Sequence, residues 1–341
     1  MIERGAGLFP MPLAAVFVAA GLGCETPSKH SASSSCVGCS LVLERLHVLG
    51  GYDDPGSADF IAPAVDNDLS GNWYVAESQG SDVLVYGPNG RYERSIGRAG
   101  RGPGELEGVA YLAVVDDSLH VFSNGRHTVF DTRGEVGRVS SVPGYVRKVL
   151  FLPDGTLVIQ GKPRTADGFG RPLHMLGPDG NTISFGRADT AVISRREIDL
   201  LAAAESADRF WIAHPLQYRL EAWSPANMML RVIDRQPDWF RWPQDRPKAY
   251  IADIWVDTAN SQIWTSVAHV HATTRDSPMP MSVVEVIDIR TGLVIASDSV
   301  ASPPLRFTTS GFLYAVHEDV VGNIVVSAWR PYLIISEESK Q

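Results

Sequence analysis

Short runs of alternating apolar and polar residues, separated by tight turns, recur along most of the chain. Residues 62–97, 109–139 and 147–186 share one unit, in which four apolar runs are joined by two tight turns and a polar loop. The turns are rich in Asp, Asn, Gly and Pro, as at residues 88–90 and 178–180. Because alternation with a period of two between such turns is typical of antiparallel hairpins, each unit predicts a four-stranded sheet.

Three further units with weaker turns follow at residues 200–234, 251–297 and 312–335. The last contains only three runs, and residues 40–49, which also alternate, could supply its fourth strand. Six such units of about 40–45 residues each are typical of a β-propeller. The pattern therefore predicts an all-β fold, a six-bladed propeller of four-stranded antiparallel blades whose ring is closed by the N-terminal strand. Only residues 194–204 could form a helix instead.

The N-terminal residues do not follow this pattern. An apolar run at residues 8–22 is too short to span a bilayer comfortably but is typical of the core of a signal peptide. Cys24 follows small residues, as in the lipobox of bacterial lipoproteins, and this resemblance implies cleavage and acylation at Cys24. We therefore expect an exported protein, held by its lipid in the periplasm or at the outer membrane of a bacterium. The expected parts are a signal peptide (1–23), a lipidated cysteine with a Ser-rich tether and a CxxC motif (24–39), and the propeller (40–341).

The CxxC motif at Cys36 and Cys39 admits three interpretations: a redox pair, half of a zinc site, or a local disulfide. A zinc site would need two more ligands, and no second CxxC or HxxxH occurs in the sequence. A thioredoxin-like motif would open a helix, whereas this one precedes a predicted strand. In an oxidising compartment, a disulfide between Cys36 and Cys39 is favoured.

Composition narrows the possible partners. Of the 341 residues 44% are hydrophobic and 20% are charged, which is typical of a globular domain. The net charge of −9 disfavours nucleic acid, because a non-specific nucleic-acid binder needs a clustered basic surface. No Walker sequence and no G-x-S-x-G elbow occurs.

One stretch resembles a known repeat. Residues 125–131 (GRHTVFD), preceded by Ser123 and Asn124, resemble the core of an NHL repeat with its N-x-R-[VI]-x-V-[FY] pattern. Residues 61–134 as a whole look like the six-bladed NHL-like propeller lipoproteins of bacteria, although the first unit lacks the Asn and Arg of the pattern. The resemblance implies a fold and a location but no chemistry.

The glycine-rich stretch at residues 95–106 (SIGRAGRGPGEL) raises the possibility of a phosphate-binding loop. Its glycine spacing fits no phosphate-binding motif, Pro103 removes an N–H, and no helix follows. We expect it to join the first blade to the second, its glycines permitting turns with positive φ.

A binding module is the leading hypothesis for the function. Loops between second and third strands and loops between blades lie on one face of a propeller, and we expect this face to bind an unidentified protein, peptide or carbohydrate. We expect a monomer that reaches the membrane only through its lipid. The candidate ligand-contacting residues on that face are Arg98, Arg101, Glu105, His214, Trp239, Trp242, His269 and His271.

The alternative is a metal-dependent hydrolase or lyase at the mouth of the channel. The first strand of each blade lines the channel, and we assign Asp66, Tyr111, Lys148, Asp253 and His317 to these strands. Asp66, Asp253 and His317 could hold Ca²⁺ or Zn²⁺, whereas the binding-module hypothesis implies no cofactor. His269 and His271 could also begin a metal site, because alternation puts both imidazoles on one side of a strand.

Overall fold

The computed structural model describes residues 39–51, 54, 62–142, 146–152, 154–161, 164, 165, 168, 169, 173–178, 180–185, 201–240, 249–271 and 279–335. The predicted signal peptide, Cys24, Cys36 and the Ser-rich tether lie outside these residues, as does Trp242. Cys39 is disulfide-bonded. Its partner is one of the two cysteines outside the described residues, so the pairing with Cys36 stays a prediction.

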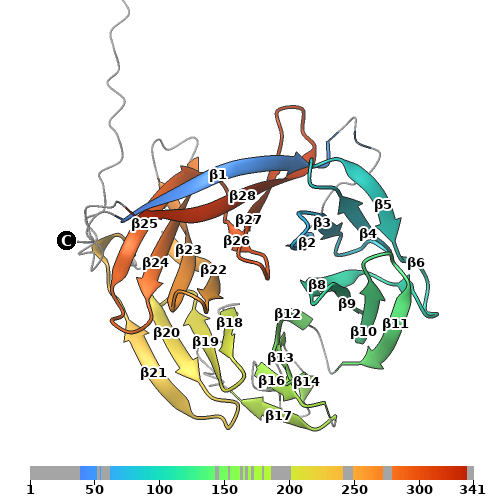
Figure 1. Ribbon diagram of the computed structural model, residues 1–341, viewed down its shortest axis with the longest axis horizontal. Helices are drawn as coiled ribbons and strands as arrows, with labels where there is room; N and C mark the ends of the chain where they lie inside the picture. Colours follow the sequence, from blue (N-terminus) through green and yellow to red (C-terminus); the bar gives the residue numbers. More distant parts are fainter. Residues whose placement is uncertain are drawn as a thin grey trace, which may run out of the picture. The chain divides into compact units, whose positions relative to one another are not determined.

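Six four-stranded antiparallel sheets stand side by side in a ring, as predicted (Figure 1). The runs of Val, Ile, Leu, Trp and Tyr become strands because alternate side chains then pack against the blades on either side. Blade 1 contains β2 (Ala64–Asn67), β3 (Trp73–Ala76), β4 (Val83–Tyr86) and β5 (Tyr92–Ile96). Blade 2 contains β8 (Val109–Val115), β9 (Ser118–Ser123), β10 (Arg126–Asp131) and β11 (Val136–Ser141). Blade 3 contains β12 (Val146–Phe151), β13 (Leu157–Gly161), β16 (Leu173–Leu176) and β17 (Thr182–Phe185).

The second half of the ring contains the longest strands, in blades 5 and 6. Blade 4 contains β18 (Leu201–Ser206), β19 (Arg209–His214), β20 (Arg219–Trp223) and β21 (Met229–Asp234). Blade 5 contains β22 (Ala249–Asp257), β23 (Gln262–His271), β24 (Met279–Asp288) and β25 (Val294–Ala301). Blade 6 contains β26 (Arg306–Phe307), β27 (Leu313–Glu318), β28 (Ile324–Ile335) and β1 (Cys39–Leu49). Two small two-stranded sheets lie between these strands: β6 (Arg98–Ala99) pairs with β7 (Glu105–Leu106), and β14 (Arg164–Thr165) pairs with β15 (Gly168–Phe169). A short 3₁₀ helix, η1 (Asp238–Phe240), follows blade 4.

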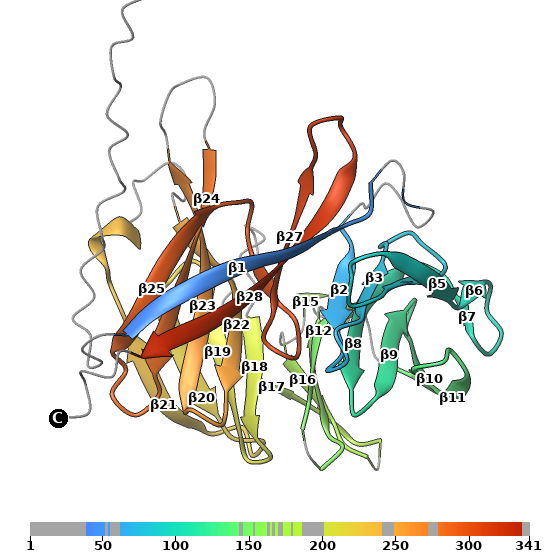
Figure 2. The same cartoon turned by 45° about the horizontal axis from the view of Figure 1, so that its top comes forward.

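The N-terminal strand closes the ring, as the sequence predicted. β1 lies antiparallel to β28 along its length, with Cys39 opposite Ile335 and Leu49 opposite Val326 (Figure 2). The sequence-based boundaries of this blade were wrong. The two apolar runs at 323–326 and 332–335 belong to the single strand β28, and the blade begins at Arg306 in β26, before residue 312.

The hydrophobic core lies between neighbouring blades. Trp211, Ile254 and Val267 pack together between blades 4 and 5, and Trp73 and Tyr314 belong to the cluster between blades 6 and 1. Trp73 and Trp211 are at most 2% exposed. Because removal of such a ring from a close-packed interior costs about 3–5 kcal/mol, these side chains are main contributors to stability. The candidate helix at 194–204 is a strand over its described part, which belongs to β18. Among the described residues, no helix has the length and apolar character needed to cross a membrane.

The up-and-down order of the strands defines two faces. The turns between first and second strands and between third and fourth strands form one face, which we call the turn face. The loops between second and third strands and between blades form the other, which we call the loop face. The six innermost strands (β2, β8, β12, β18, β22 and β26) surround the axis and end at the turn face (Figure 1).

Candidate functional site

A pocket of about 500 Å³ lies on the axis at the turn face. All six blades line it with the ends of their innermost strands and the turns that follow, from Asn67 in blade 1 to Ser310 in blade 6. Its walls are mainly apolar and include Val115, Phe151 and Trp255. The volume is within the range of about 300–1,000 Å³ that is typical of small-molecule sites.

The turn between β26 and β27, residues 308–312, forms one wall of the pocket and reaches toward the centre of the ring (Figure 1). The N–H of Thr308 donates to the carbonyl of Phe312 over 2.9 Å, which closes the turn. Gly311 has φ +87°, and a Cβ atom there would lie 2.6 Å from the indole of Trp255. Glycine is therefore required both for the backbone conformation and for the close approach to Trp255.

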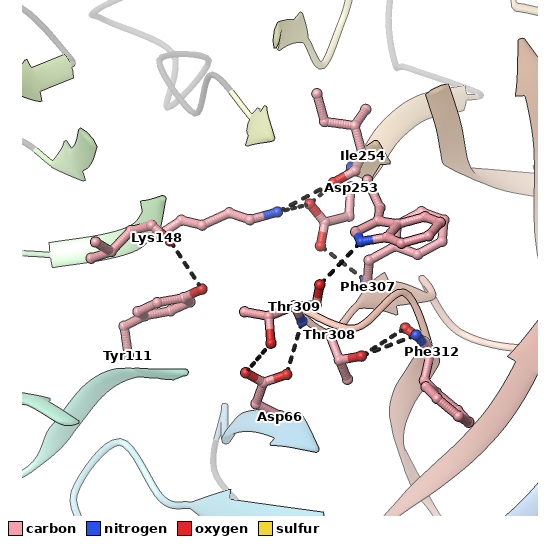
Figure 3. A network of polar contacts seen from close by, with 11 residues as sticks. Asp66, Tyr111, Lys148, Asp253, Ile254, Phe307, Thr308, Thr309 and Phe312 are labelled. Carbon is pink, nitrogen blue, oxygen red and sulfur yellow. Dashed lines mark hydrogen bonds and ion pairs between the residues drawn. The ribbon is translucent and has the colours of Figure 1, made fainter. Parts of the chain in front are cut away.

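Asp66 of β2, in the neighbouring blade 1, holds this turn (Figure 3). Its Oδ1 accepts the N–H of Thr309 over 2.8 Å, and its Oδ2 accepts the hydroxyl of Thr309 and the N–H of Val114, each over 2.7 Å. The carboxyl is 1% exposed. Burial raises the pKa of Asp66 to about 6, although the donors around it favour the ionised form. Asp66 therefore links blades 1, 2 and 6 through one carboxyl group.

Lys148 of β12 and Asp253 of β22 form an ion pair across the axis (Figure 3). Lys148 Nζ lies 2.5 Å from Asp253 Oδ1, and the two side chains are 18% and 7% exposed. Asp253 also accepts the N–H of Ile254 over 2.9 Å and the N–H of Phe307 over 3.0 Å. The charge of the one lysine in the pocket wall is thus balanced, and the same carboxylate fixes the start of the β26–β27 turn.

Aromatic residues complete the inner wall. Trp255 donates its indole N–H to the carbonyl of Thr309 over 3.1 Å and lies nearly parallel to the ring of Phe307. The hydroxyl of Tyr111 donates to the carbonyl of Val149 over 3.3 Å. Burial, and then the nearby negative charges of Asp66 and Asp253, raise the pKa of Tyr111 well above its ordinary value. Tyr111 is therefore a neutral phenol at physiological pH.

Acidic and apolar side chains surround the mouth of the pocket. Asp116 and Asp117 form the turn between β8 and β9 and are exposed. Leu69, in the turn after β2, is 95% exposed. Asp68 beside it accepts hydrogen bonds from Asn72 within the same turn. The mouth therefore presents exposed carboxylates next to exposed apolar surface, whereas the polar groups deeper in the pocket are hydrogen-bonded.

The glycine-rich connection between blades 1 and 2 lies on the loop face, as predicted. Arg98 and Arg101 are 76% and 80% exposed and pair with Glu105 and Glu107 over 3.2 and 2.9 Å. Oε2 of Glu105 accepts the N–H of Gly102 over 2.6 Å. The hydrogen bond to Gly102 and the contact with Arg98 lower the pKa of Glu105. The backbone of this loop thus binds the carboxylate of Glu105, one of its own side chains, where a phosphate-binding loop would bind a phosphate.

The other candidates on the loop face lie at blades 4 and 5. Trp239 packs edge-to-face on Tyr218 and Phe240, so it helps to fill the junction between these blades. His269 lies beside Trp239, with ring centroids 6.4 Å apart. His271 ends β23, and its side chain is outside the described atoms. As ligand contacts, all the loop-face residues stay predictions.

His214, at the end of β19, lies 3.3 Å from Oε1 of the buried Glu221. Its contact, together with that of Arg219, lowers the pKa of Glu221 to about 2 despite burial. His214 is therefore held by a neighbour in its own blade.

The residues of the metal hypothesis are not brought together as expected. Asp66, Tyr111, Lys148 and Asp253 lie on innermost strands, but the assignment of His317 to an innermost strand was wrong, because it lies on β27, the second strand of blade 6. Its Nε2 is 2.7 Å from the hydroxyl of Ser327, and its Nδ1 is 3.0 Å from the carbonyl of Glu318. Within the described part of the chain, no three His, Cys, Asp or Glu side chains are grouped so that they could hold a metal ion. A role of Asp66, Asp253 and His317 with Ca²⁺ or Zn²⁺ stays a prediction.

The sequence pointed to Tyr111 and Lys148 in the pocket wall, but not to the turns that build the rest of the pocket. Thr309 and Gly311 form an ordinary-looking TTSG turn, and Asp116 and Asp117 fit any hairpin. Their partners are far away in sequence: Thr309 is 243 residues from Asp66. One weak signal was available, because two consecutive Asp residues stand where a tight hairpin usually has Asn and Gly.

Comparisons with known proteins support the fold. No protein-family model matches the sequence, and no curated protein matches it significantly. The chain is similar to the structure of a DUF4221 family member from Bacteroides vulgatus, with 10% identity, a TM-score of 0.59, and 86% of this chain and 99% of that chain covered. It is also similar to a "Putative exported protein" from Bacteroides fragilis, with 11% identity, a TM-score of 0.57, and coverage of 88% and 96%. At these identities the likeness shows the propeller fold, and the NHL-like and lipoprotein assignments stay predictions.

Proposed function

We propose that this protein is an exported, lipid-anchored propeller that binds a small molecule in the axial pocket of its turn face. The observation that carries the proposal is the pocket itself, because six blades contribute to one apolar-walled cavity of about 500 Å³. A cavity of this size, lined by all six blades around the axis, can surround a ligand on most sides.

The state of the polar groups in the wall and directly behind it supports binding rather than a reaction. Asp66 accepts three hydrogen bonds, Asp253 is paired with Lys148, and Tyr111 is a neutral donor to a carbonyl. A general acid or base must reach the proton it transfers, and these groups are already engaged with the protein. They instead make the pocket rigid, which lowers the ordering that a ligand must impose.

Export is supported by the sequence. The apolar run at residues 8–22 and the lipobox-like Cys24 are typical of a bacterial lipoprotein precursor. One structural neighbour also carries a name that refers to export. The described chain begins and ends at the turn face, since Cys39 pairs with Ile335 at the end of β28.

Binding of the neutral apolar dye N-phenyl-1-naphthylamine tests the proposal, because its fluorescence rises in an apolar environment. We expect saturable binding of one dye per chain. Val115→Trp, which enlarges a half-buried side chain of the pocket wall, should weaken binding about tenfold or more. Val139→Trp, on the outer strand β11, is the matched control, because Val139 is 39% exposed and outside the pocket wall. Absent dye binding, or equal binding by both variants, would contradict the proposal.

A further inference from the structure

We infer that the axial pocket selects organic cations, namely an amine carried on an apolar body, with the charged end at the mouth beside Asp116 and Asp117. This inference rests on the proposed function and names its class of ligand. The cavity makes the site, and the charges around it decide which ligands it accepts.

The balance of charge in the pocket wall is negative. Among the described residues, Asp68, Asp116 and Asp117 line the pocket together with one cation, Lys148. The charge of Lys148 is matched by Asp253 at 2.5 Å, so it does not attract an anion from solution as a free ammonium would. The buried carboxyl of Asp66 adds negative potential behind the wall. A cationic ligand is therefore favoured over a neutral or an anionic one of the same shape.

Asp116 and Asp117 differ from four other aspartates of the turn face. The carboxylates of Asp131, Asp154, Asp257 and Asp288 accept backbone N–H groups of their own turns. Those of Asp116 and Asp117 have no hydrogen-bond or ion-pair partner among the described residues, although both line the pocket. Their charge is thus available to a ligand, whereas that of the others is used locally.

The apolar groups define the orientation of the ligand. Val115 and Phe151 lie along the wall, and Leu69 is exposed at the mouth. An apolar body that enters between them would cover Leu69 and leave its amine near Asp116 and Asp117. The opposite orientation would place a positive charge beside Lys148 and an apolar group beside two carboxylates, so it is disfavoured.

A charge series on one apolar body tests this inference. Octylamine, 1-octanol and octanoate share the same chain, and each is titrated against bound N-phenyl-1-naphthylamine at pH 7.5 and moderate salt. We expect octylamine to displace the dye at a concentration at least about tenfold lower than octanoate, with octanol between them. In Asp116→Asn/Asp117→Asn the three compounds should become similar.

The double variant keeps the turn intact. Asp116 and Asp117 have φ 47° and 59°, a conformation in which asparagine is at least as favourable as aspartate. Asp154→Asn/Asp208→Asn removes the same charge from other turns of the same face and should keep the preference for octylamine, because neither residue lines the pocket.

The possible outcomes separate this inference from the proposed function. If the dye binds and Val115→Trp blocks it, but octanol or octanoate competes as well as octylamine, the pocket stands and the preference for cations is wrong. A preference that survives Asp116→Asn/Asp117→Asn would also overturn the inference. If the dye does not bind the wild-type protein, both proposals fall together.

Discussion

Two short glycine-containing segments on opposite faces differ in where their contacts lie. In the connection at 97–108 the charged side chains pair with one another, since Glu105 and Glu107 form ion pairs with Arg98 and Arg101. The turn at 308–312 instead forms hydrogen bonds with three other blades. The glycine-rich connection is easily recognised in the sequence, and its ion pairs lie within the loop. The turn at 308–312 has an ordinary sequence, but it connects blades at the centre of the ring.

The difference shows which part of this fold forms a pocket. A ring of blades is closed on its outside by β1, which pairs with β28. At the centre of the ring is a second, inner closure, in which Thr309 of blade 6 forms hydrogen bonds with Asp66 of blade 1 and Val114 of blade 2. Because the inner closure lies on the axis, it also forms a wall of the pocket. Position relative to the axis, rather than glycine content, therefore marks the segment that we propose to be functional.

The largest expected effect comes from a methyl group at the inner closure. In Gly311→Ala, the new Cβ would lie 2.6 Å from the indole of Trp255, and φ +87° is unfavourable for alanine. We expect a loss of about 4 kcal/mol in the free energy of unfolding, measured by urea denaturation, together with a loss of dye binding. Gly155→Ala is the matched control, since Gly155 has φ +83° but no atom within 4 Å of the new Cβ. It should lose only about 1 kcal/mol, and equal losses in the two variants would contradict the tight packing at Gly311.

A second effect concerns pH. Because the pKa of Asp66 is raised from 3.8 to about 6 in the folded protein, the native state holds this proton more tightly than the unfolded state. The stability that this proton contributes is complete below about pH 4 and is lost as the pH rises through about 6. Relative to Asp66→Asn, the wild-type protein should lose about 3 kcal/mol over this interval. Urea denaturation of both proteins at several pH values measures this difference, and parallel pH profiles would contradict the raised pKa.

The smallest effect is expected in the glycine-rich connection. Glu105→Gln keeps an oxygen acceptor for the N–H of Gly102 and removes only the exposed pairing with Arg98. The melting temperature should change by about 1 °C or less, and dye binding should be unchanged. A large loss of either would show that the ion pair between Glu105 and Arg98 matters beyond this loop.

The fold was predictable because its signals are local. Each hairpin carries its own alternation and turn residues, and the unpaired run at 40–49 matched a blade that lacked a strand. The limits of blade 6 were not predictable in this way, because β26 has only two residues and β28 continues through Pro331, opposite Leu43 of β1. Proline is tolerated there because the other side of β28 at this point has no partner in β27.

The candidate site was only partly predictable. Asp66, Lys148 and Asp253 were assigned to the channel because each lies in the first predicted strand of its unit. Their partners were not foreseeable, since Lys148 meets Asp253 over 105 residues of sequence and Asp66 meets Thr309 over 243. The sequence also directed attention to the loop face, whose long polar connections stand out, whereas the pocket opens among the short turns of the opposite face.

Hydrogen–deuterium exchange with N-phenyl-1-naphthylamine at saturation is the most direct test of a binding site on the axis, because it reports on both segments at once. We expect slower exchange in peptides that cover residues 109–117 and 306–312, and unchanged exchange in peptides that cover residues 97–108. Protection confined to residues 97–108, or to the other connections of the loop face, would contradict a binding site on the axis of the turn face.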